Sequence, residues 1–201
     1  MTKCVVEVGP VNVRGPGEVD PDLVAAALES IDDEIALLDE QPVAVSALWR
    51  AVFRSVLSGC DGTAVLVCPT WWSSTRIERV HQAASSQAAE VVVLLRAPVI
   101  TDGEPAVPTV VEIAPDFVVV CRSGRVVMAE RRLGEPTDVV EAVVDGVGVD
   151  SAVFVDAPIG VDDGPSLASA VAGRLRALGR AVTTVHQDHV LTATRDQPRS
   201  W

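Results

Sequence analysis

The stretch that decides the fold is AVLVCPTWWSSTRIERVHQAASSQAAEVVVLLRAPV, residues 64–99 of the 201-residue chain. Two short apolar runs lie in it, Ala64–Cys68 and Val91–Leu95, and continuous valine-rich runs are typical of buried strands. Between them, Ser73–Ala89 is rich in alanine and spaces its larger apolar residues for one face of a helix. This order of strand, helix and strand predicts a βαβ unit with parallel strands.

The same pattern continues on both sides of this stretch. Six further valine-rich runs predict strands: Cys4–Val8, Val110–Ile113, Phe117–Cys121, Val126–Ala129, Ala152–Val155 and Ala181–Val185. Apolar spacing and end signals predict four further helices: Pro21–Ser30, Ser46–Leu57, Thr137–Asp145 and Ser166–Gly179. Asp20 caps the first of these helices and Ser166 caps the last. A strand pair, Ile35–Leu38 and Val43–Val45, is predicted around the turn between them.

Each half of the chain is thus predicted to hold a group of strands followed by alternating helices and strands. This order is typical of the ribonuclease-H-like fold, so the fold class is α/β with two ribonuclease-H-like halves. The polar segment TDGEPAVP, residues 101–108, is predicted to link a first lobe, residues 1–100, to a second lobe, residues 109–201. Two such halves predict an actin/DnaK-like arrangement, and the chain is too short to hold that arrangement's inserted outer subdomains.

The composition excludes several classes of protein. The only lysine among the 16 basic residues is Lys3, so a P-loop, a kinase-type strand lysine and a Schiff-base lysine have no candidate. The formal net charge of −12 argues against nucleic-acid binding, which needs a basic face. The longest apolar stretch, Ala88–Ile100, is interrupted by Glu90 and Arg96. It is shorter than the roughly 18–20 residues of a spanning helix, so no membrane span is expected.

The four cysteines show no spacing typical of a metal site; they are Cys4, Cys60, Cys68 and Cys121. Three of them lie in or beside valine-rich runs. We therefore expect four buried, reduced thiols in a cytosolic domain.

Residues 64–99 resemble the segment of DnaK-type chaperones in which a strand, a proline-containing turn, a helix and a second strand follow one another. The two turns are Cys68-Pro69-Thr70 and Arg96-Ala97-Pro98, and PVAVSALWRAVFRSVL, residues 42–57, resembles the preceding helix. More narrowly, most of the chain is similar to the amino-terminal part of type VII secretion-associated proteins of mycobacteria and related actinobacteria. The similar stretches are AALESIDDEIALLDEQPVAVSALWRAVF (26–53), CPTWW (68–72) and VEIAPDFVVV (111–120).

The resemblance implies a nucleotide cleft whose positions are degenerate in this chain. Glu7 and Gly9 take the first phosphate-loop positions, and Pro10 replaces a hydroxyl residue there and removes a backbone donor. Glu112–Asp116 takes the second phosphate loop without any glycine. Asp156 and Gly160 take the adenosine-loop positions, and the family's catalytic lysine has no equivalent. The carboxylates Glu7, Glu112, Asp116 and Asp156 would add negative charge where a triphosphate must lie.

Four smaller signals each allow two interpretations. Trp71 and Trp72 are predicted to be one buried and one surface ring, or an anchor at a protein interface. His186–His189 is predicted to be an exposed turn rather than a metal site. Gly146–Gly148 is predicted to end a helix rather than to bind a dinucleotide. Asp162–Gly164 is predicted to be a solvated turn, with a ligand loop as the alternative.

These observations predict a non-catalytic pseudo-ATPase that serves as a scaffold or regulatory domain of a type VII secretion system. No catalytic residue, cofactor or metal is assigned. The expected partners are proteins of the secretion apparatus or its substrates, and a homodimer is left open. The expected location is the cytoplasm, at the inner face of the membrane, within a longer membrane-associated protein. The alternatives are a divergent ATPase that binds Mg-nucleotide between its lobes and a metal-dependent phosphohydrolase or nuclease of ribonuclease-H-like fold.

Overall fold

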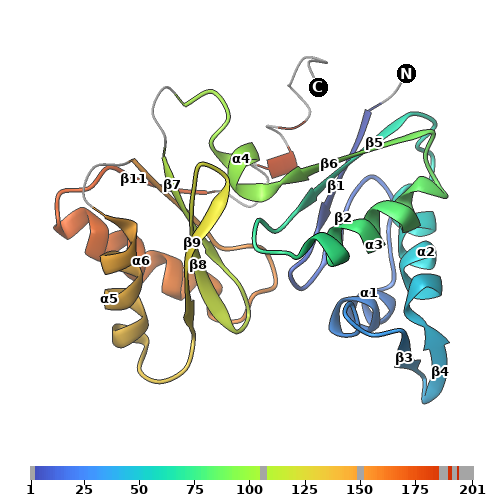
Figure 1. Ribbon diagram of the computed structural model, residues 1–201, viewed down its shortest axis with the longest axis horizontal. Helices are drawn as coiled ribbons and strands as arrows, with labels where there is room; N and C mark the ends of the chain where they lie inside the picture. Colours follow the sequence, from blue (N-terminus) through green and yellow to red (C-terminus); the bar gives the residue numbers. More distant parts are fainter. Residues whose placement is uncertain (1–2, 105–107, 149–151, 186–189, 192–193, 195–201) are drawn as a thin grey trace. The chain divides into compact units, whose positions relative to one another are not determined.

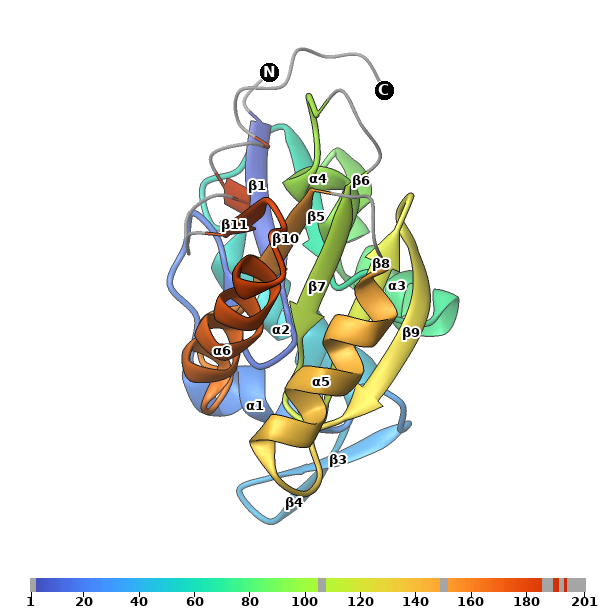
Figure 2. The same cartoon turned by 90° about the vertical axis from the view of Figure 1, so that its left-hand side faces the viewer.

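The structure is a computed structural model that describes residues 3–104, 108–148, 152–185, 190–191 and 194 (Figures 1 and 2). Its described residues divide into two compact units. Unit 1 contains the described residues up to Leu94 together with Thr194, and unit 2 contains the described residues between Leu95 and Ala193.

Unit 1 is built on a four-stranded sheet with strand order β2-β1-β5-β6. The strands are β1 (Lys3–Val8), β2 (Val13–Arg14), β5 (Thr63–Cys68) and β6 (Glu90–Leu95). β1 pairs with β2 in the antiparallel sense and with β5 in the parallel sense, where Cys4 lies opposite Ala64. The helices are α1 (Pro21–Glu29), α2 (Val45–Val56) and α3 (Ser74–Ser85). The helix α3 connects neighbouring strands β5 and β6, which confirms the predicted order of residues 64–99.

The core of unit 1 depends on one face of α2. Four residues of this helix, Leu48, Trp49, Val52 and Phe53, are at most 2% exposed. The rings of Trp49 and Phe53 lie 5.9 Å apart. Full burial of side chains of this size contributes about 1.5–3 kcal/mol each to folding, so α2 supplies much of the stability of unit 1.

A separate hairpin extends from unit 1 between α1 and α2 (Figure 1). Its strands are β3 (Ile35–Leu38) and β4 (Gln41–Ala44), and they form a two-stranded sheet of their own. Asp39 and Glu40 have positive φ values of 50° and 62°, as the two central residues of a type I′ turn must have. The sequence correctly predicted the hairpin but placed its second strand too late, because Val45 is the first residue of α2.

Unit 2 contains a five-stranded sheet with strand order β11-β10-β7-β8-β9. The strands are β7 (Thr109–Ile113), β8 (Phe117–Arg122), β9 (Arg125–Arg131), β10 (Val153–Asp156) and β11 (Val182–Thr184). The first three form an antiparallel meander, and β10 is parallel to both β7 and β11. This is the strand order of a ribonuclease-H-like sheet, so the α/β fold class and its ribonuclease-H-like character are confirmed.

Two of the three helices in the described part of unit 2, the second and the third, agree with the sequence except at their ends. The three helices are α4 (Arg96–Ile100), α5 (Pro136–Val147) and α6 (Gly164–Ala177). Gly148, at φ 76°, ends α5 as expected. The N-cap of α6 is Asp163 rather than Ser166, and Pro165 lies inside the first turn, where its missing N–H costs nothing. The short helix α4 replaces the turn that the sequence predicts around Pro98.

The division into units falls between Leu94 and Leu95. The predicted lobe limits of 1–100 and 109–201 remain a prediction, and residues 105–107 of the predicted linker 101–108 lie outside the described residues. Within the described ranges, no helix has the length and apolar character needed to cross a membrane.

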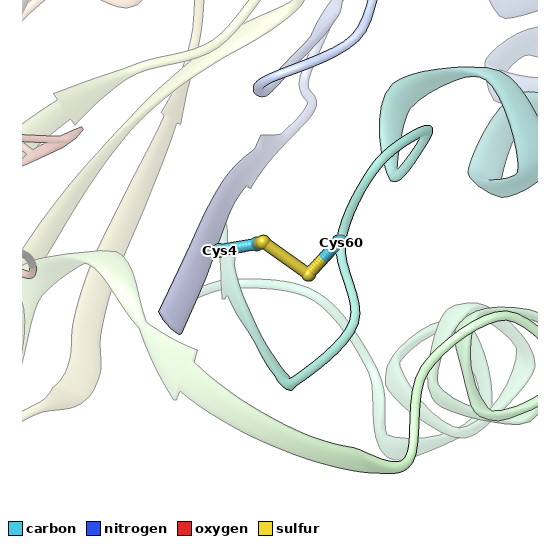
Figure 3. The surroundings of a disulfide bond; sticks show 2 residues. All are labelled: Cys4 and Cys60. Carbon is cyan, nitrogen blue, oxygen red and sulfur yellow. A yellow bond between two sulfur atoms is a disulfide. The ribbon is translucent and has the colours of Figure 1, made fainter. Parts of the chain in front are cut away.

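The prediction of four reduced thiols is wrong for two of the cysteines. Cys4 of β1 and Cys60, in the turn between α2 and β5, form a disulfide whose partners are 56 residues apart in sequence (Figure 3). Cys68 and Cys121 are free and buried, as expected. Burial raises the pKa of the Cys68 thiol to about 12, so this thiol stays protonated at neutral pH. The sequence could not show the pairing, because it depends on a Cα–Cα separation of 6.2 Å that only the fold creates.

Candidate functional site

The first phosphate-loop position of unit 1 holds a buried carboxylate that forms an ion pair with a partly exposed arginine. Glu7 lies near the end of β1 and is 1% exposed. Its cross-strand neighbour on β2 is Arg14, whose Nη1 lies 3.5 Å from Glu7 Oε2. The carboxylate that the sequence placed in an anionic cleft therefore has a cationic partner within the same sheet.

Gly9 lies where the chain turns after β1. Its backbone N–H donates a hydrogen bond to the carbonyl of Asn12 at 2.7 Å, and its φ is 73°. A Cβ built on Gly9 would lie 2.7 Å from Cζ2 of Trp72, so only glycine fits against this ring. Pro10, which follows in a cis peptide bond, has no N–H. The turn therefore has little backbone donor capacity to offer a phosphate group.

Trp71 and Trp72 confirm the expected difference in burial. Trp72 is 6% exposed, whereas Trp71 is partly buried, and their rings meet edge to face at 6.4 Å. The Arg76 guanidinium lies 5.6 Å from the centre of the Trp71 ring. Arg76 also forms a two-pronged ion pair with Asp32, and this hydrogen bonding lowers the pKa of Asp32. The Trp71 ring is therefore fixed in place at a partly exposed position.

In unit 2, Asp156 forms a buried ion pair with Arg96. Asp156 ends β10 and is 1% exposed, and Arg96 begins α4 and is 3% exposed. The guanidinium Nε and Nη2 donate to the two carboxylate oxygens, the second at 3.0 Å. Glu112, also buried, lies opposite Asp156 on the parallel strand β7. The position predicted for the adenosine loop is thus occupied by a structural salt bridge.

Arg132 joins the two loops that follow β7 and β10. Its Nη1 donates to the Ala114 carbonyl at 2.8 Å and its Nη2 to the Asp162 carbonyl at 2.6 Å. Its backbone N–H donates to the carbonyl of Asp116, whose side chain is exposed. Ligands of open α/β sheets bind outside the carboxyl ends of parallel strands, and Arg132 bridges this edge of unit 2.

The second phosphate-loop position has few remaining backbone donors. The N–H of Ala114 donates to the Phe117 carbonyl at 2.9 Å, and Pro115 has no N–H. Gly160 lies in the loop after β10 at a φ of 87° and is exposed. Asp163, the N-cap of α6, has a φ of 55° and lines a cavity of about 460 Å³ together with Arg132 and Pro136.

The predicted site residues are thus divided between the two units. Glu7 and Gly9 lie at the end of β1 in unit 1, where Gly9 contacts Trp72. Asp116, Asp156 and Gly160 lie at the ends of β7 and β10 or in the loops that follow them in unit 2. Sequence reasoning missed the arginines beside these groups, which are Arg14, Arg96 and Arg132. Arg96 carried a signal, because a charge that interrupts an apolar run needs a buried partner.

Metal binding has no candidate in the described part of the chain, where no group of three or more His, Cys, Asp or Glu side chains could hold an ion. The predicted turn His186–His189 lies outside the described residues.

Among solved structures, 14 chains match this chain, and one of them is the ethanolamine utilization protein EutJ from Carboxydothermus hydrogenoformans. It matches with a TM-score of 0.42 and 15% identity, over 96% of this chain and 86% of that chain. No protein-family model matches the sequence, and no curated protein matches it.

Proposed function

We propose that the protein is a non-catalytic, actin/DnaK-like pseudo-ATPase that acts as a scaffold or regulatory domain. The observation that carries this proposal is the state of the phosphate-loop donors. The N–H groups of Gly9 and Ala114 already donate to backbone carbonyls, and the next residue in each loop is a proline. Phosphate recognition at such loops depends on backbone N–H groups that point at the ligand, so a triphosphate would find few donors in either unit.

The ion pairs of Glu7 and Asp156 support the same proposal in a different way than the sequence suggested. Glu7 and Asp156 were expected to repel a nucleotide through uncompensated negative charge, but Arg14 and Arg96 compensate them. Both carboxylates are therefore already paired within the chain. If either carboxylate bound a metal ion instead, its arginine would lose its ion-pair partner. Such a loss is costly in a protein interior.

Nucleotide titration tests the proposal directly. We expect no heat of binding by calorimetry and no shift in melting temperature with Mg-ATP at millimolar concentration. A one-site ligand present at about 100 times its Kd stabilises a protein by about 2.7 kcal/mol, which a thermal scan detects easily. Micromolar binding of Mg-ATP would establish the divergent ATPase instead. Hydrolysis of phosphate esters or nucleic acid with Mg²⁺ or Mn²⁺ alone would establish the phosphohydrolase or nuclease.

We further propose that this scaffold or regulatory role belongs to a type VII secretion system. The domain would lie in the cytoplasm at the inner face of the membrane, within a longer membrane-associated protein. The support is the sequence resemblance of residues 26–53, 68–72 and 111–120. The partners would be proteins of the secretion apparatus or its substrates, which fits the fixed, partly exposed ring of Trp71 as an interface anchor.

Capture from actinobacterial membranes tests this placement. The protein, used as bait, is expected to retain components of the secretion membrane complex that mass spectrometry identifies. Trp71→Ala is expected to reduce this capture at least about tenfold, because loss of an aromatic anchor costs at least about 2 kcal/mol of binding. The matched control is Arg54→Ala, which changes an exposed residue on α2. Equal capture by the wild type and Trp71→Ala would reject the anchor role.

A further inference from the structure

Exposed apolar side chains gather on two strands, one in each unit. Six large apolar residues of the described chain are strongly exposed: Ile35, Leu37, Val126, Val127, Leu133 and Leu178. The first two lie on β3 of unit 1, and the next three lie on β9 of unit 2 or within two residues of its end. Both strands are at an end of their sheets, where unpaired backbone groups can accept another strand.

The first surface, which we name the acidic hairpin, comprises residues 32–44. Leu37 lies opposite Pro42 and Ile35 opposite Ala44, so these four residues share one face of the hairpin, and all four are exposed. Leu37 is 71% exposed. Residues 32–44 carry five acidic and no basic side chains, which gives a local charge of −5. Arg76 and Arg79 of α3 compensate two of them, Asp32 and Glu34, at the base of the hairpin.

A hollow beside the acidic hairpin has the chemistry to accept an arginine. It lies between α1 and β3 and has a volume of about 540 Å³. Its lining includes the acidic residues Asp22, Glu29 and Asp39 and the apolar residues Ile35 and Leu37. An arginine side chain has an apolar stem and a charged head, so this combination of walls suits it better than it suits an apolar side chain.

The second surface, which we name the basic strand, comprises residues 125–133. It contains three arginines and one glutamate, for a local charge of +2 in a chain whose net charge is −12. Arg131, Ala129 and Val126 are exposed and pair with alternate residues of β8, so they share one face of β9. A register shift opposite Val120 and Cys121 puts Arg125, also exposed, on the other face. The basic strand therefore presents Arg131 beside exposed apolar side chains, a combination that the acidic hairpin and its hollow would accept.

We propose that two copies of the chain associate through these surfaces, with the basic strand of one copy on the acidic hairpin of another. The contact joins two different surfaces, one in each unit, so every copy offers both an acidic hairpin and a basic strand to its neighbours. Charge complementarity selects the pairing, because two acidic hairpins would repel each other. The two surfaces comprise 13 and 9 residues, fewer than the roughly 20–30 residues a side of a standard interface, so we expect a Kd on the order of 10–100 µM. The proposal does not depend on whether the protein binds nucleotide.

Sedimentation velocity of the purified chain tests the proposal. From about 5 µM to about 500 µM protein, the weight-average mass is expected to rise beyond that of a monomer. Leu37→Glu and Arg131→Glu are each expected to weaken association at least about tenfold, because one inserts a charge among acidic groups and the other reverses a charge in the partner surface. Leu178→Glu and Arg54→Glu are matched controls at exposed positions outside both surfaces and are expected to associate like the wild type.

Mixing the two weakened variants gives the sharpest result. Leu37→Glu retains an intact basic strand, and Arg131→Glu retains an intact acidic hairpin. A mixture of the two is therefore expected to regain association, but only as far as dimers. A wild type that stays monomeric at all concentrations overturns the proposal, as does a mixture that stays monomeric while the wild type associates. Circular dichroism and melting temperature equal to the wild type show that each variant is folded.

Discussion

Replacing Arg96 by alanine is expected to lower the free energy of unfolding by about 3–5 kcal/mol. Arg96 and Asp156 are both nearly inaccessible to water and form two charged hydrogen bonds with each other. Removing the guanidinium leaves a buried carboxylate without this partner. It also releases the link between α4 and the end of β10, which lie 60 residues apart in sequence. Urea unfolding followed by circular dichroism measures the change.

The double variant Arg96→Met/Asp156→Leu separates loss of the ion pair from loss of packing. Replacing both charges by apolar side chains leaves neither charge of the pair behind, so it is expected to be far less destabilising than Arg96→Ala alone. Arg174→Ala, which breaks an exposed ion pair with Glu141, is expected to leave the unfolding curve nearly unchanged. Equal destabilisation by Arg96→Ala and Arg174→Ala would mean that the buried pair has no special role.

Reduction of the Cys4–Cys60 disulfide is expected to be the second large effect. The bond closes a loop of about 57 residues, for which the chain-entropy relation gives a stabilisation of about 4 kcal/mol. Unfolding in urea with and without a phosphine reductant measures this difference. The double variant Cys4→Ala/Cys60→Ala should unfold at the same urea concentration with and without reductant, because it has no disulfide to lose.

Thiol titration checks the state of the bond independently. The native protein is expected to react slowly with a disulfide reagent at about pH 8, because Cys68 and Cys121 are buried and the pKa of Cys68 is about 12. Without reductant, the unfolded protein should expose two thiols, and four only after reduction. Four thiols in the unreduced, unfolded protein would contradict the disulfide.

The raised pKa of Cys68 also sets a direction for the pH dependence. Between about pH 9 and pH 12 the unfolded chain loses the Cys68 proton while the folded chain keeps it. Folding stability from this group is therefore constant below about pH 9 and falls as the pH rises toward 12.

Much of the fold could be predicted because apolar patterns are local. Runs such as Val91–Leu95 and the helical face of residues 46–57 require only neighbours in sequence to be recognised. The short helix α4 could not, because a proline near a helix start and a proline in a turn look the same without the surrounding contacts.

The site was predictable in its positions but not in its partners. The sequence placed Glu7 and Asp156 at strand ends, and the structure agrees. Whether such a carboxylate faces a ligand or an arginine depends on contacts between elements far apart in sequence. Arg96 reaches Asp156 across 60 residues, and no local pattern encodes that distance. Because arginines compensate these carboxylates, repulsion of a nucleotide no longer explains the proposed inactivity. The explanation that is left is that the backbone N–H groups of Gly9 and Ala114 already donate hydrogen bonds within the chain.

The position of Thr194 has a consequence for dissecting the molecule. Thr194 is fully buried and belongs to unit 1, where its carbonyl accepts a hydrogen bond from Nζ of Lys3 in β1. The chain thus leaves unit 1 near Leu94 and returns to it about 100 residues later, so unit 2 is an insertion within unit 1. A gene fragment that ends in the segment 101–108 would encode unit 1 without this returning piece. A circular permutant that joins the two chain ends and opens at the boundary near Leu94 would make each unit continuous in sequence, so that either unit can be expressed alone to test its autonomy.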